Sequence, residues 1–286
     1  MSFKNKGGQY KMKKGLLKKL FATTLVGAMA ISMVACGGED AGKKDMLTQI
    51  KESGKFTVGM SIDYAPYEFF VMENGEKKQV GMDVDLIAEI AKDMGVTYEI
   101  KEMDFDTICE SVANGVINMG VSGLSPEPER MELVDFSDIY FEAEQGILIS
   151  KKNADKIKSI DDLKGMKVGA QTGSIQASLA NEIEGAKVTL LKDVPTLVQT
   201  LKRGDLDALI VELPVADIQA IVNDDLAVAK EKIKDNSGGG SAVGLPKGQD
   251  ALKEQINKTI KRLKDEGKIE EFYENGVKLS KNEVVE

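Results

Sequence analysis

Apolar residues in the first half of the chain follow the spacing of alternating strands and helices. In 83–95 and 106–115 they recur three and four positions apart, as on one face of a helix. Short apolar runs at 55–60, 96–103 and 116–121 flank these helices and predict strands. This half of the chain therefore has the order strand, helix, strand, helix, strand.

The same order recurs in the second half. A shift of 89 residues places Thr107 on Thr196 and Gly115 on Gly204, although identity is low, so the match is structural rather than a sequence repeat. Two such halves predict an α/β fold with two lobes, each a mostly parallel sheet flanked by helices. The elements expected in the second half are strands at 166–170, 186–191 and 205–211 and helices at 174–183 and 196–204.

Two segments join the predicted lobes. Residues 146–152 lead into the second lobe, and the Gly–Ser-rich run 237–244 leads out of it. A helix at 249–267 then belongs with the first lobe. Two crossing strands predict a hinge, and a cleft between hinged lobes is a common small-molecule site. We expect lobe 1 at 51–147 plus 244–286 and lobe 2 at 148–243.

Residues 1–35 have the pattern of an export signal. Seven lysines lie between Lys4 and Lys19 without an acid, and 16 uncharged residues follow. The uncharged run is shorter than the roughly 20 residues of a spanning helix, which leaves a transmembrane anchor as the lesser alternative. Met12 is an alternative start, because a lysine-rich signal also begins there.

Charge and missing residue types exclude several function classes. Of 38 basic and 47 acidic residues, residues 1–35 carry seven lysines and no acid, so the exported part has a net charge of −16. Nucleic-acid binding is therefore not expected. The chain has no histidine, which removes Ser-His-Asp and Cys-His catalysis and makes a zinc site improbable. We expect no metal, no cofactor and no catalysis, and we expect Cys109 to be a small buried residue.

Open parallel sheets bind ligands beyond the carboxyl ends of their strands, and four loops of this chain lie there. Arg130 can hold a carboxylate with two parallel hydrogen bonds. The opposite lobe supplies a helix start, whose free N–H groups attract an anion, and the acid Glu212. This set suits the carboxylate and ammonium of an amino acid. The loops are 61–68, 122–130, 171–176 and Glu212 with its neighbours, and they contribute Ser122, Gly123, Ser125, Gln171, Gly173 and Ser174.

The assignment of Arg130 has a simpler alternative, and the aromatic residues nearby divide between the cleft and the core. Arg130 could be a surface charge or pair with Glu132 or Asp135. Tyr64 and Phe105 are expected in the cleft, beside the ligand side chain. The remaining aromatic residues of this region are expected in the core: Tyr67, Phe69 and Phe70.

An ordered set of motifs between Lys51 and Tyr273 resembles the polar-amino-acid branch of bacterial extracellular solute-binding proteins, the receptors of ABC importers. The resemblance implies the two-lobed periplasmic-binding-protein fold with a two-strand hinge, a free amino acid as ligand and the transmembrane subunits of a permease as partners. The motifs are GMSIDYAPYEF, GMDVDLIAEIAKDMG, MDFDTI, VSGLSPEPERMELVDFSDIYFEA, DLKGMKVGAQTGSIQ and LKRGDLDALIVELPVA.

The resemblance also implies a role for each site residue. Arg130 would grip the ligand carboxylate, helped by Ser122 and Ser125. Glu212, usually an Asp in the family, would take the ammonium. Tyr64 and Phe105 would enclose the ligand side chain. The helix start falls on Gly173-Ser174-Ile175, where Ile175 replaces a hydroxyl residue and offers only its backbone N–H.

Residues 33–36, Met-Val-Ala-Cys, resemble a bacterial lipobox. This implies a diacylglyceryl group on Cys36, and two acyl chains hold a protein stably at a membrane. Residues 36–50 would then be a lipidated, flexible tether. The protein would be a monomer on the outer face of the cell membrane.

The resemblance indicates an amino acid as the ligand but does not by itself give the type of side chain. Members that bind basic amino acids often carry Asp where this chain has Ser61, which counts against arginine or lysine unless another acid compensates. The function we expect is binding of a basic or amide-type L-amino acid, or cystine, for import. The alternatives are a cyclic-acid dehydratase, for which Glu212 is the one acid that the sequence places in the cleft, and a sensor or adhesion lipoprotein. The acids that could compensate are Glu68, Asp104, Glu142 and Glu144.

Overall fold

The computed structural model describes residues 45–233 and 240–284. The predicted signal, Cys36 and most of the tether lie outside the described residues, as does part of the Gly–Ser-rich run. No helix within the described ranges combines the length and the apolar character needed to cross a membrane.

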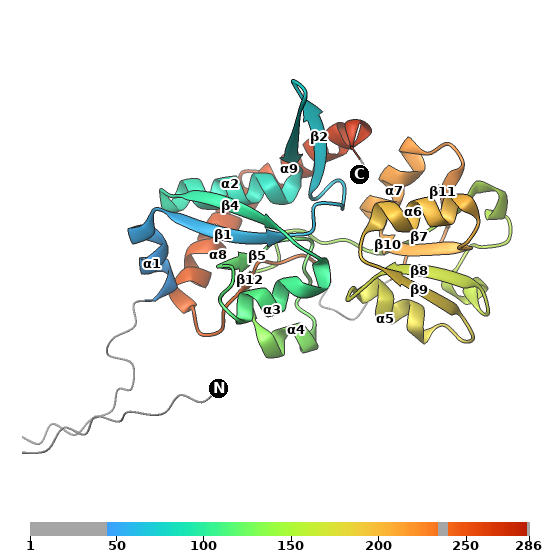
Figure 1. Cartoon of the computed structure of the whole chain (residues 1–286), viewed down its shortest axis with the longest axis horizontal. Helices are drawn as coiled ribbons and strands as arrows, with labels where there is room; N and C mark the ends of the chain where they lie inside the picture. Colours follow the sequence, from blue (N-terminus) through green and yellow to red (C-terminus); the bar gives the residue numbers. More distant parts are fainter. Residues whose placement is uncertain (1–44, 234–239, 285–286) are drawn as a thin grey trace, which may run out of the picture. The chain divides into compact units, whose positions relative to one another are not determined.

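The strands form two five-stranded sheets, and each has three adjacent parallel strands that begin at one of its edges (Figure 1). In both sheets the first strand of a half lies between the second and the third, so the order is β4-β1-β5 in one and β9-β8-β10 in the other. The two-lobed α/β prediction and its structural echo are confirmed. The parallel strands are β1 (Lys55–Met60), β4 (Thr97–Glu102), β5 (Met119–Gly120), β8 (Lys167–Gln171), β9 (Lys187–Leu191) and β10 (Ala208–Glu212).

Antiparallel strands complete each sheet. In the first, β12 lies between β5 and β6, and in the second, β7 lies between β10 and β11. A separate hairpin, which the apolar pattern did not predict, turns at Asn74 and Gly75 with φ of +54° and +85°. The strands are β2 (Phe69–Glu73), β3 (Glu76–Val80), β6 (Asp135–Phe136), β7 (Gln145–Ser150), β11 (Leu226–Val228) and β12 (Gly244–Leu245).

The predicted helices are present, with local sequence signals at their ends. Ser174 caps its helix by accepting the N–H of Ala177, and Gly95 and Gly204 end theirs in the left-handed conformation. Pro195 lies in the first turn of its helix rather than before it. The helices expected from the sequence are α2 (Met82–Met94), α3 (Ile108–Ala113), α5 (Ile175–Glu182), α6 (Val194–Arg203) and α8 (Asp250–Asp265).

Further helices were not predicted. α7 follows β10 directly, and α9 follows α8 and packs on α2 and α8. The additional α-helices are α1 (Met46–Ser53), α4 (Pro128–Leu133), α7 (Leu213–Val222) and α9 (Lys268–Leu279), and the 3-10 helices are Phe105–Thr107, Lys151–Asn153, Ile160–Leu163 and Ser280–Asn282.

Two chain segments run antiparallel between the sheets. Tyr140 donates its N–H to the carbonyl of Ser241, and Ser241 donates to Phe141, both at 2.8 Å. A Cβ at Gly240 would lie 2.4 Å from the carbonyl oxygen of Phe141, so this close approach requires glycine. The paired segments have the arrangement expected of a hinge, while the lobe boundaries at 147/148 and 243/244 stay a prediction.

The core predictions for single residues are confirmed. Tyr67 and Phe69 are fully buried, and Phe70 is half-buried against the core. Cys109 lies in an apolar cluster with Ile108 and Val112, where burial raises the pKa of its thiol.

Candidate ligand-binding site

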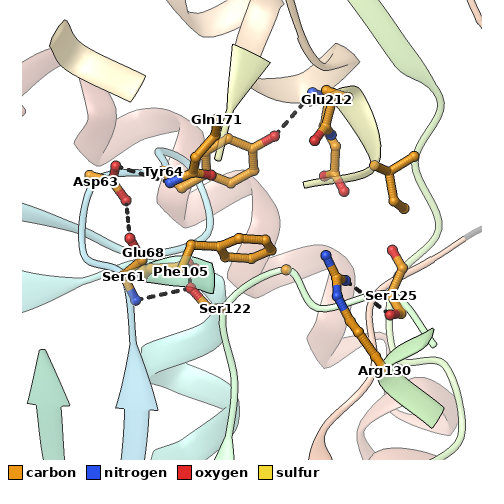
Figure 2. Close-up of a pocket in the computed structure, with 13 residues that line it drawn as sticks. Ser61, Asp63, Tyr64, Glu68, Phe105, Ser122, Ser125, Arg130, Gln171 and Glu212 are labelled. Carbon is orange, nitrogen blue, oxygen red and sulfur yellow. Dashed lines mark hydrogen bonds between the residues drawn. The ribbon is translucent and has the colours of Figure 1, made fainter. Parts of the chain in front are cut away.

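A cavity lies where the predicted cleft loops meet (Figure 2). Both lobes line it, and nine of the eleven predicted ligand-binding residues are among its walls. The remaining four wall residues were not chosen from the sequence. The predicted nine are Tyr64, Phe105, Ser122, Gly123, Ser125, Arg130, Gln171, Ile175 and Glu212, and the other four are Ser61, Asp63, Glu68 and Gln176.

Arg130 is fixed from several directions. Its guanidinium donates to the carbonyls of Ser125 and Gly173, each at 3.0 Å, and pairs with Glu127 at 3.0 Å. The Phe105 ring lies under it, 5.1 Å from the guanidinium carbon. The acid that pairs with Arg130 is therefore Glu127, three positions before it in the chain, and not Glu132 or Asp135, which the sequence had offered as partners. Three acceptors use only part of the five-donor fork, which leaves N–H groups for an anion in the cavity.

The start of α5 forms the opposite wall. Ile175 and Gln176 are its first residues, and the first N–H groups of a helix have no acceptor within it. These N–H groups and Arg130 together make an electropositive region. It is suited to a carboxylate.

Gly173 and Ser174 build this helix start but do not line the cavity, in contrast to the expectation from the sequence. The Ser174 hydroxyl donates to the Gln171 carbonyl at 2.7 Å and accepts the N–H of Ala177 at 3.1 Å. Gly173 has a φ of +74°, and a Cβ on it would lie 2.7 Å from Cβ of Asp106 in the other lobe. Both residues instead line a second, more open cavity behind Arg130.

Glu212 lies at the junction of β10 and α7 and is 4% exposed. Its backbone N–H donates to the phenol oxygen of Tyr64 at 3.0 Å, across the two lobes. Figure 2 shows its side chain on the far side of the cavity from the stem of Arg130. The cavity thus presents a carboxylate and a guanidinium to the same space.

The aromatic residues lie between these ends. Tyr64 stacks on Tyr67, with ring centroids 5.6 Å apart and an angle of 21° between planes. Burial raises the pKa of the Tyr64 hydroxyl well above its usual range, so this residue stays neutral. The rings of Tyr64 and Phe105 lie on opposite sides of the cavity (Figure 2).

Asp63 is the main residue that the sequence analysis missed. Its carboxylate accepts the Ser61 hydroxyl at 2.7 Å and the backbone N–H of Val194 at 3.0 Å. Burial raises its pKa to about 6. The signal available in the sequence was its place inside a predicted cleft loop, directly before Tyr64. Gln176 likewise lies in the predicted loop 171–176.

Two buried carboxylates, Glu68 in the cavity wall and Asp83 outside it, lie on the first lobe. Glu68 accepts the Ser122 hydroxyl at 2.5 Å, and Asp83 accepts the Tyr140 hydroxyl and the N–H of Gly123. Burial raises the pKa of both carboxyls. Two expectations change as a result. The Ser122 hydroxyl donates to Glu68 and does not point to the anion that Arg130 would bind. Glu212 shares the cavity wall with two other acids, Asp63 and Glu68.

Comparison with known proteins identifies the family. Residues 56–275 match the model of bacterial extracellular solute-binding proteins, family 3. The chain belongs to this family. It is 33% identical to the arginine-binding extracellular protein ArtP of Bacillus subtilis, over 90% of this chain and 96% of that protein. It is 30% identical to the glutamine-binding protein GlnH of the same organism, over 92% and 98% of the two chains.

Solved structures of this family share the fold. A substrate-binding protein of an amino acid ABC transporter, AbpA from Streptococcus pneumoniae, bound to L-arginine, superposes with a TM-score of 0.79 at 35% identity. The match covers 82% of this chain and 98% of that one. The relatives that match most of this chain are binding proteins rather than enzymes.

Proposed function

We propose that this family member is the substrate-binding receptor of an ABC importer and that its ligand is a polar L-amino acid. The observation that carries the proposal is that Arg130 and Glu212 line one cavity from different lobes. An α-amino acid is a zwitterion, and a site with a cation at one end and a carboxylate at the other matches it. The relatives named for arginine and glutamine binding take such ligands.

The carboxylate of the ligand would bind at Arg130. The guanidinium fork can give two parallel hydrogen bonds, and the Ser125 hydroxyl and the N–H groups of Ile175 and Gln176 can add others. Phe105 stacks under the guanidinium and limits its movement. Ile175 has no side-chain hydroxyl to contribute, so its part is the backbone N–H.

The ammonium group would bind at Glu212, which is buried at the end of β10. Arg130 and Glu212 come from different lobes, so only the closed arrangement brings both to one ligand molecule. A ligand that binds the closed state better shifts the population toward it. Bonds such as Glu212 N–H to Tyr64 and Arg130 to the Gly173 carbonyl support a closed state as the binding form.

The proposal also includes export of the receptor and its attachment to the membrane. The family is one of extracellular proteins, which supports export. Lipidation of Cys36 would anchor the receptor to the outer face of the membrane as a monomer, beside the permease that takes the ligand. The receptor would catalyse no reaction.

Calorimetric titration of the purified chain, unfolded and refolded to remove carried ligand, tests the proposal. The titrants are the twenty amino acids and cystine. We expect tight binding of one or a few polar L-amino acids and weak binding of their D-forms. The absence of binding to every titrant would contradict the proposed function. Turnover of a cyclic carboxylic acid would favour the enzyme alternative.

A further inference from the structure

Asp63 lies in the cavity wall and accepts hydrogen bonds from both lobes. One carboxylate oxygen accepts the hydroxyl of Ser61, on its own lobe, at 2.7 Å. The other accepts the N–H of Val194 at 3.0 Å and the side-chain amide of Gln171 at 3.4 Å, both on the second lobe. The same carboxylate lines the cavity.

The bond to Val194 is a helix cap supplied by the other lobe. Val194 is the first residue of the ten-residue helix α6. The helix's own cap, Asp193, accepts the N–H of Thr196 at 2.7 Å. The N–H of Val194 therefore finds its acceptor in Asp63, and the helix N-terminus favours a negative charge there.

This arrangement places a carboxylate in surroundings that are otherwise acidic. Burial is the largest cause that raises the pKa of Asp63, and the charges of Asp193 and Glu102 add to it. Glu283, Glu102 and Asp193 line a further hollow beside Asp63, separate from the ligand cavity and from the cavity behind Arg130. Among the described residues that line the ligand cavity, Arg130 is the only cation, and it is paired with Glu127.

Asp63 lies where the end of a ligand side chain would reach if Arg130 held the ligand carboxylate. Figure 2 shows Asp63 and Gln171 on one side of the Tyr64 and Phe105 rings and Arg130 on the other. A ligand whose carboxylate is held by Arg130 would pass its side chain between the two rings and end near Asp63. Planar guanidinium groups and ammonium groups both interact well with aromatic faces.

We propose that Asp63 selects an amino acid whose side chain ends in a cation, and that closure of the two lobes depends on this cation. The inference rests on the proposed function and names the ligand class as basic L-amino acids. Ser61, which from the sequence counted against such ligands, has the role of orienting Asp63 through its hydroxyl.

The dependence of closure follows from the partners of Asp63. When the lobes meet, its carboxylate leaves water and is capped by Val194, and none of its partners in the described part of the chain is a cation. A basic ligand provides the missing positive charge, and a neutral isostere leaves a buried, uncompensated charge. Neutral ligands therefore bind the receptor without fully closing it.

L-arginine and L-citrulline test the inference, because a neutral urea group in citrulline replaces the guanidinium at almost the same shape. We expect the wild type to bind arginine roughly 10–100-fold more tightly, the range for a hydrogen bond to a charged group. In Asp63→Asn this ratio falls to about threefold or less. Asp193→Asn removes a charge from the same helix end, outside the cavity, and keeps the wild-type ratio.

Small-angle X-ray scattering reports closure in the same samples. Arginine compacts the wild type and citrulline does not, whereas citrulline compacts Asp63→Asn. If Asp63→Asn fails to fold, Ser61→Ala serves, with a ratio reduced severalfold.

Equal wild-type affinity for arginine and citrulline, or an unchanged ratio in Asp63→Asn, overturns this inference while amino-acid binding stands. A wild type that binds no amino acid overturns the proposed function as well.

Discussion

The phenol oxygen of Tyr64 accepts the backbone N–H of Glu212 at 3.0 Å, and this bond joins the loop after β1 to the end of β10. It connects an aromatic wall of the cavity to the acid that we assign to the ligand ammonium. The bond crosses between lobes, so it exists only when they are together. It therefore contributes to the closed state without contacting the ligand through the hydroxyl.

Tyr64→Phe is expected to weaken amino-acid binding by roughly twofold to tenfold, because one neutral hydrogen bond contributes about 0.5–1.5 kcal/mol. The ring and its stacking on Tyr67 remain. Stopped-flow measurement should show the change mainly in the dissociation rate. Tyr98→Phe, in β4 and away from the cavity, is the control and should bind as the wild type does. Unchanged affinity in Tyr64→Phe would show that the bond does not stabilise closure.

Gly173→Ala is expected to prevent full closure. The added Cβ would lie 2.7 Å from Cβ of Asp106 on the other lobe, a distance that requires the lobes to separate. Affinity should fall at least roughly tenfold, the effect of about 1.4 kcal/mol. Scattering from the ligand-saturated variant should show a larger radius of gyration than that of the wild type.

The matched control for that variant is Gly204→Ala. Gly204 has a similar φ of +84°, but nothing lies within 4 Å of its added Cβ. Both variants carry the backbone strain of a left-handed alanine, about 1 kcal/mol of stability. Equal loss of ligand affinity in the two variants would show that strain, rather than the contact with Asp106, is responsible.

Arg130→Ala is expected to weaken amino-acid binding by roughly 2–5 kcal/mol, because the ligand carboxylate and Glu127 would both lose their cationic partner. Arg130→Lys keeps the charge but not the planar fork, so its affinity should lie between those of wild type and Arg130→Ala. Calorimetry measures both, with exposed Arg203→Ala as the control. An affinity within a few-fold of wild type in Arg130→Ala would contradict the carboxylate assignment.

The regular part of the fold was predictable because helix and strand periods depend on local sequence. β5 is shorter than the apolar run 116–121 because the Asn118 side chain accepts the N–H of Thr57 at 2.8 Å and replaces part of the ladder. α7 was missed because it begins without a loop after Glu212, and the apolar run of β10 continues into it.

The loops that form the site could be predicted from the sequence, but not all of the side chains that face the cavity. The rule for strand ends located them, but it does not tell which of two neighbouring residues turns into the cleft. The side chain of Asp63 is oriented by its hydrogen bond from Val194, 131 positions away in the chain. Such a contact exists only after both lobes have folded. Ser122 and Ser125 looked equivalent in sequence, yet only Ser122 meets the buried Glu68.

Glu68→Gln is expected to change how the stability of the protein depends on pH. Burial, and then the charge of Asp83, raise the pKa of Glu68 well above its ordinary value of 4.5. The native state therefore binds more protons than the unfolded state above that pH, and the free energy of unfolding falls as the pH rises through this window.

Glutamine can still accept the Ser122 hydroxyl, and its amide can donate toward Asp83 without a proton to lose. Urea unfolding of wild type and Glu68→Gln between pH 5 and 8 should show a difference that grows with pH in favour of the variant. Glu76→Gln, in the exposed strand β3, is the control and should follow the wild type. Parallel curves for wild type and Glu68→Gln would show that Glu68 takes up no proton on folding.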